Sequence, residues 1–110
     1  MQAEVLPVGP EERDDASGQR LRMKIGDSEL DKAIADLEAG NWQGAHEIVQ
    51  RDEQSPLACW AHGIVHLMEG DEANARYWFR QAHRPLGKVG SIAEEISALK
   101  SAAERGRTKV

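Results

Sequence analysis

Two stretches of this chain, thirty residues apart, carry the same pattern of helix end and helix start. Residues 37–45 read LEAGNWQGA and residues 67–75 read LMEGDEANA. In each, a Gly is followed at once by a good helix-capping residue, Asn41 or Asp71, and five residues after the Gly by an Ala. This signature, repeated at a fixed spacing, predicts stacked helical hairpins.

Apolar residues at helical spacing predict the first hairpin. A helix is expected to begin at Asp27-Ser28 and to end at Gly40, and its buried face carries Leu30, Ala33, Ile34 and Leu37. Its partner is expected over residues 42–51, with Ala45, Ile48 and Val49 turned inward.

The second hairpin begins at Ser55-Pro56, where Ser is expected to cap the helix and Pro suits its first position. This helix has two apolar or small faces, one with Leu57, Trp60, Ala61, Ile64 and Met68, the other with Cys59, His62, Gly63 and His66. It is therefore expected to lie between neighbouring helices and to approach one of them closely at Gly63. The next helix turns Ala75, Trp78, Phe79 and Ala82 inward.

Ser91 and Glu94 have the spacing of a capping box, which predicts a further helix. It is expected to bury Ile92, Ile96, Leu99 and Ala103 and to cover the second hairpin, as the end of a repeat stack requires. The prediction is an all-α chain: residues 1–26 form a flexible or extended arm, residues 27–105 two antiparallel hairpins with a C-terminal cap helix, and residues 106–110 a frayed tail.

The second hairpin resembles the tetratricopeptide repeat. The residues that carry this resemblance are Gly63, Gly70, Ala75, Phe79 and Ala82. The first copy matches it less well, through Ala33, Gly40, Ala45 and Val49, and Asp52 stands where the last Ala is expected. The spacing is also shorter than the usual 34 or so residues. Residues 37–84, with the motif H-x-x-E-G-D-x-x-N-A-x-Y-W from His66 to Trp78, are similar to a group of small bacterial and fungal helical proteins without an established activity. The resemblance implies a fold and little about function.

The net charge limits which partners we expect for the chain, and the cysteine content indicates where it is located. With 14 basic and 19 acidic residues, the chain has a formal charge of −5, which disfavours nucleic acid and anionic membranes. No apolar run is long enough to span a bilayer, and the first residues lack the features of a secretory signal. A single Cys forms no internal disulfide, so the expected location is the cytoplasm.

Histidines provide one candidate site. His62 and His66 are four residues apart and share a helix face, a spacing that suits two ligands of one metal ion. In tetratricopeptide geometry this face turns toward the preceding helix and His46, while Glu69 and Asn74 flank the same turn. These residues can form a zinc or iron site, or a catalytic site. The alternative is that the histidines are partly buried and form hydrogen bonds between helices.

Surplus aromatic and basic residues provide the other candidate site. Tyr77, Trp78 and Phe79 are consecutive, so at least one of them must face away from the core. Arg76, Arg80 and Arg84 form a row at helical spacing that can pair with acidic groups. The favoured hypothesis is a protein-interaction module without a cofactor, which binds a peptide, a protein or a second copy of itself. Its binding residues are predicted to be Trp60, Ile64, Met68, Arg76, Trp78 and Arg80. A third hypothesis is an obligate homo-oligomer joined through Trp60, Ile64 and Met68.

Overall fold

Both predicted glycine turns are present in the computed structural model, which describes residues 24–108 and the side chains of residues 24–106. Gly40 and Gly70 have φ angles of 82° and 88°, a left-handed conformation that glycine adopts without strain. The side chains of Asn41 and Asp71 then accept hydrogen bonds from the amides of Gly44 and Asn74, each at 3.2 Å. The sequence repeat is therefore a structural repeat, down to the capping bond.

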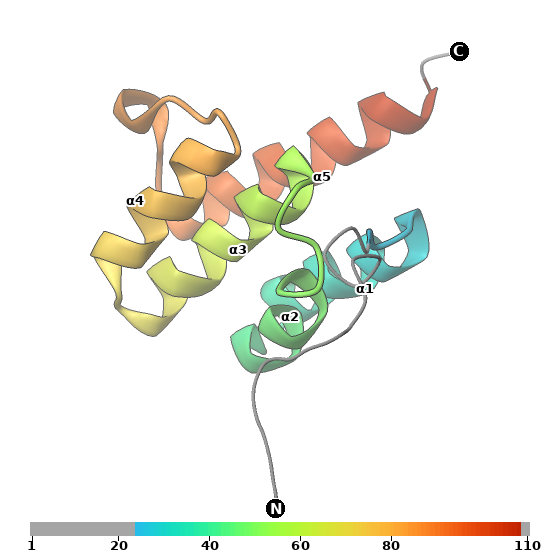
Figure 1. The fold of residues 1–110 in the computed structure, drawn as a ribbon, viewed down its shortest axis with the longest axis horizontal. Helices are drawn as coiled ribbons and strands as arrows, with labels where there is room; N and C mark the ends of the chain where they lie inside the picture. Colours follow the sequence, from blue (N-terminus) through green and yellow to red (C-terminus); the bar gives the residue numbers. More distant parts are fainter. Residues whose placement is uncertain (1–23, 109–110) are drawn as a thin grey trace, which may run out of the picture.

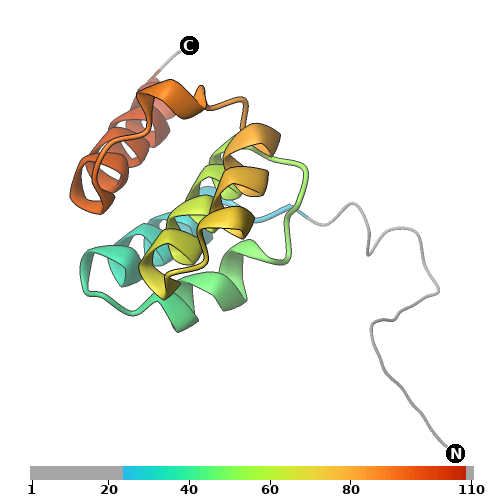
Figure 2. The ribbon, with the colours of Figure 1, turned by 90° about the vertical axis from the view of Figure 1, so that its left-hand side faces the viewer.

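Five α-helices and one short 3-10 helix make up the regular structure of the described residues (Figure 1). They are α1 (Asp27–Glu38), α2 (Trp42–Val49), α3 (Pro56–Glu69), α4 (Glu72–Gln81), η2 (Leu86–Lys88) and α5 (Ile92–Thr108). The hairpin of α1 and α2 packs against the hairpin of α3 and α4, and α5 lies along α3 and α1 (Figure 2). The prediction of an all-α chain with stacked hairpins and a further C-terminal helix is confirmed. None of the helices in this part of the chain is long and apolar enough to cross a membrane.

Helix α3 is the centre of the packing, because it contacts the other four α-helices. Its two small or apolar faces are both covered, as predicted, and Ala58, Ala61, Gly63, Ile64 and Val65 are buried. A Cβ atom added at Gly63 would lie 2.9 Å from two ring carbons of Phe79, which is 1 % exposed. The glycine therefore allows α4 to approach α3 closely.

Asp52, not Ser55, provides the side chain that holds the start of α3. The Ser55 side chain makes no capping hydrogen bond, whereas Asp52 is buried and its Oδ1 accepts the amides of Gln54 and Ser55 at 3.1 and 3.0 Å. Its Oδ2 accepts the amide of Ile25 at 3.2 Å. The last residues of the predicted arm are thus attached to the helical domain, and residues 1–23 of that arm lie outside the described residues.

The capping box of α5 is confirmed, but the buried face of this helix differs from the prediction. The amide of Ser91 donates to Glu94 Oε1 at 2.9 Å, and the amide of Glu94 donates to Ser91 Oγ at 3.1 Å. Ile92 was predicted to be buried, yet it is 37 % exposed, and Glu95 is 1 % exposed instead. Burial of this carboxylate is tolerated because Trp60, Arg84 and Gly90 donate hydrogen bonds to it. The helix runs to Thr108, past the predicted end at residue 105.

Candidate metal centre

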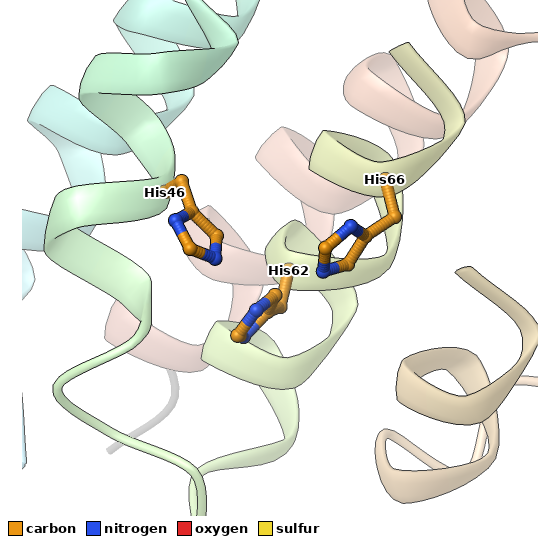
Figure 3. Close-up of side chains that lie close together, drawn as sticks. All are labelled: His46, His62 and His66. Atoms are coloured by element: carbon orange, nitrogen blue, oxygen red, sulfur yellow. The ribbon is translucent and has the colours of Figure 1, made fainter. Parts of the chain in front are cut away.

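Three histidines from two hairpins meet between α2 and α3 (Figure 3). His62 and His66 lie one turn apart on α3, and their ring centroids are 5.1 Å apart. His46 comes from α2, with its centroid 4.9 Å from that of His62 and 5.6 Å from that of His66. One nitrogen from each ring lies within 4.8 Å of the other two. The convergence expected for the metal site is therefore present in the structure.

Glu69 fixes the tautomer of His66. The two side chains are joined by a bond of 2.7 Å between Nδ1 and Oε1. Because a carboxylate only accepts, Nδ1 donates this bond and carries the proton of the neutral ring. The unprotonated nitrogen is then Nε2, and the tip of the ring turns toward His62 and His46 (Figure 3). A histidine oriented in this way by a carboxylate is the usual arrangement of a metal ligand and its outer partner.

His62 is the most deeply buried of the three rings. It is 4 % exposed, and its Nδ1 is the one buried side-chain nitrogen or oxygen in the described residues without a hydrogen-bond partner. Trp78 covers it, with the two rings 3.9 Å apart and nearly parallel. An unsatisfied buried group of this kind costs about 1–3 kcal/mol, so it calls for an explanation.

Burial and the neighbouring imidazoles lower the pKa values of His62 and His46, so both rings are neutral at neutral pH. Burial, followed by the nearby His46 and His66, lowers the pKa of His62 to about 3. The pKa of His46 is also lowered, first by burial and then by His66, although Glu69 and Glu47 act in the opposite direction. A metal ion binds the neutral form of histidine, so it would not have to displace a proton from either ring at neutral pH.

The nitrogen atoms are close enough to bind one ion after at most a small movement. Zinc is held at about 2.0–2.1 Å from histidine nitrogens, which places tetrahedral ligands about 3.4 Å apart. Because the three nitrogens lie within 4.8 Å of one another, the rings would have to close by at most about 1.4 Å. Rotation about the side-chain torsions of His46, which is only half-buried, can supply this movement.

The other residues predicted for this site take different roles. Glu69 accepts the hydrogen bond from Nδ1 of His66, so it would be the outer partner of a metal ligand. Asn74 donates from Nδ2 to Asp71 Oδ2 at 2.8 Å and is occupied at the start of α4. Cys59, which was not predicted for this site, is a buried thiol on α3. Burial, and then the charges of Asp52 and Glu53, raise its pKa to about 11, and the thiol donates to the carbonyl of Glu53, so it does not supply a thiolate ligand at neutral pH.

The predicted interaction residues do not form one surface. Ile64 is fully buried, and Met68 and Trp60 pack against the core. Trp60 also donates from Nε1 to Glu95 at 3.0 Å. Ile64 thus offers no area to a second copy of the chain, and Trp60 and Met68 are only partly exposed. Trp78 covers His62, so Arg76 and Arg80 are the only two of the six predicted binding residues that are exposed.

Arg84 does not continue the exposed row that was predicted with Arg76 and Arg80, because its side chain is only 22 % exposed and pairs with the buried Glu95. It donates to both oxygens of Glu95, from Nε at 3.0 Å and from an NH2 group at 2.8 Å. The amide of Gly90 donates to the same carboxylate at 2.9 Å. Burial alone would raise the pKa of Glu95, but these donors outweigh it and lower the pKa. Sequence reasoning missed this group, because no local pattern distinguishes Glu95 from the exposed Glu94 beside it.

Comparison of the chain with protein-family models, with curated proteins and with solved structures finds no significant match in any of the three. The resemblance to the tetratricopeptide repeat therefore stays a prediction, and function is argued from the geometry of the site.

Proposed function

We propose that this chain is a metal-binding protein whose centre consists of His46, His62 and His66. Two observations carry the proposal: one nitrogen of each imidazole lies within 4.8 Å of the other two, and Nδ1 of His62 is buried without a hydrogen-bond partner. A metal ion would bind one nitrogen of each ring and would use the lone pair that Glu69 leaves on His66.

The donor set indicates the class of metal. Imidazole nitrogens suit zinc, copper, nickel, cobalt and iron, while calcium and magnesium prefer oxygen ligands. Three imidazole ligands without a thiolate fit zinc first, and iron is the alternative. Because the ligands come from α2 and α3, the ion would join the two hairpins and stabilise their packing.

A competition titration with a chromophoric zinc chelator tests the proposal. Wild type should bind one zinc ion per chain, and His46→Ala, His62→Phe and His66→Ala should each weaken binding by more than about 100-fold, since losing a ligand exceeds the loss of an outer partner. His83→Asn is the matched control, because His83 is exposed and outside the cluster. Asn tolerates the positive φ of 60° at this position. Equal zinc affinity in wild type, the three cluster variants and His83→Asn would refute the proposal.

Peptide binding stays the second proposed function. It is supported by a cavity of about 300 Å³ beside α4, lined by apolar side chains such as Leu67, Phe79 and Leu86 and by Arg76 and Glu72, which form an ion pair at 3.6 Å. A peptide with an apolar anchor and an acidic group that competes with Glu72 for Arg76 would suit this lining. A peptide-library screen against wild type and Arg76→Glu tests it, and a lack of ligands that distinguish the two proteins would argue against it.

A further inference from the structure

We infer that a metal ion bound by the three histidines keeps one coordination position that no residue of the protein fills. This position would be open to water or to a small monodentate anion. The inference rests on the proposed metal-binding function and adds a ligand class to it. An ion whose ligands all come from the protein serves mainly structure, whereas an ion with an open position can bind and activate a ligand.

The described residues offer three donors to an ion in this cluster. In the part of the chain that the structure describes, no fourth His, Cys, Asp or Glu joins the group of His46, His62 and His66. Glu69 binds the Nδ1 edge of His66, so it cannot also reach a metal ion held at Nε2 on the other edge of the ring. Tetrahedral zinc with three protein ligands takes a water molecule as its fourth.

Asp71 does not supply the fourth ligand either. It forms a second possible group with Glu69 and His66, but that group needs the same histidine and lies beside the α3–α4 turn. The Asp71 carboxylate already accepts the amide and the side-chain NH2 group of Asn74. Its role in the turn is structural.

The burial of the three rings indicates where the open position lies. His62 is 4 % exposed and Trp78 covers its face, so this side is closed. The His66 side chain is 12 % exposed and His46 is half-buried, so solvent reaches the cluster from their side. The water or anion would therefore bind on the side of His46 and His66, away from Trp78.

The charge of the loaded centre favours an anion. Imidazole ligands carry no charge, so the bound ion would keep its two positive charges, which the nearby carboxylates of Glu69 and Glu47 offset only in part from outside the ligand set. Azide is a small monodentate anion of the class that such a position would bind.

Cobalt(II) replacement tests the inference with the full-length chain. Its visible absorption bands depend on the number and type of ligands, so they report directly on an exchangeable position. We expect azide to shift these bands in a saturable way, with one azide per cobalt and no loss of metal after gel filtration. His83→Asn should behave as wild type does.

Two other outcomes are distinguishable. Stoichiometric cobalt with bands that azide leaves unchanged, or azide that removes the cobalt, would overturn the inference and leave the metal-binding function intact. Failure of wild type to bind cobalt or zinc would overturn both. His66→Ala separates the cluster from surface sites, since an azide response that survives in this variant would place the exchangeable metal elsewhere and contradict the inference.

Discussion

The imidazole of His62 lies flat against the indole of Trp78, with ring centroids 3.9 Å apart and an interplanar angle of 7°. This stack joins α3 to α4 and restricts the rotation of the His62 ring. It also shields one face of the ring from water, which contributes to the lowered pKa. A buried ring held in one orientation is suited to be the fixed ligand of the centre, around which the more exposed His46 can adjust.

Replacing Glu69 should weaken metal binding without abolishing it. Glu69→Gln removes the charge that holds the proton of His66 on Nδ1. Loss of an outer partner of this kind typically costs about 10–100-fold in metal affinity. Zinc titration should show this loss, whereas Glu72→Gln, at an exposed glutamate near the start of α4, should leave affinity unchanged. A Glu69→Gln protein with wild-type affinity would mean that the His66–Glu69 bond serves only the turn.

The metal-free protein should lose stability as the pH falls from about 6.5 toward 3. The pKa of His62 is lowered from 6.5 to about 3 on folding, so in this range the unfolded chain binds a proton that the folded chain does not. Each pH unit within the window then costs up to about 1.4 kcal/mol from this group, and His46 acts in the same direction.

Urea unfolding between pH 7 and pH 5 isolates this effect. The lowered pKa of Glu95 also makes the protein acid-sensitive, but only as the pH falls below the unfolded value of 4.5. His62→Phe should have a flatter dependence between pH 7 and 5 than wild type. The same slope in both proteins would show that His62 is protonated or exposed in the folded state.

Adding a methyl group at Gly63 should destabilise the protein. Gly63→Ala gains about 1 kcal/mol in helix propensity but forces a Cβ against the buried ring of Phe79, and overpacking costs about 1–3 kcal/mol. We expect a lower melting temperature. Gly106→Ala is the control, because that helical glycine has no neighbour within 4 Å of an added Cβ and should gain stability. A gain at both positions would contradict the close approach of α3 and α4.

Removing the charge of Glu95 should be costly. Glu95→Gln leaves Arg84 with a side chain only 22 % exposed and without its counter-ion, a loss of about 2–4 kcal/mol. The neighbouring Glu94→Gln should change the unfolding free energy by less than about 0.5 kcal/mol, since Gln also serves in a capping box. Thermal unfolding of the two variants compares a buried and an exposed glutamate one residue apart.

Local signals predicted most of the fold. The turns at Gly40 and Gly70, the caps at Asn41 and Asp71, and the spacing of apolar residues all act within a few residues of the chain. The burial of Glu95 depends on Trp60 and Arg84, which are 35 and 11 residues away, so no local pattern contains it. The same limit applies to Asp52, because the amide of Ile25 that donates to it lies 27 residues away in the sequence.

The candidate site could be predicted only in part. The spacing of His62 and His66 follows from helix geometry, but their meeting with His46 depends on the packing of α2 against α3. Helical periodicity placed Ile64 on the predicted interaction surface, but the residue is buried. An apolar stripe in the sequence does not reveal whether another helix of the same chain will cover it.

X-ray absorption at the zinc edge, on the full chain loaded with one equivalent of zinc, reports directly whether three imidazoles bind the ion. We expect a first shell of nitrogen and oxygen at about 2.0–2.1 Å, with the outer-shell scattering of three imidazole rings and no sulfur. The imidazole contribution should fall in His46→Ala and persist in His83→Asn. A sulfur shell at about 2.3 Å, or a shell without imidazole scattering, would contradict it.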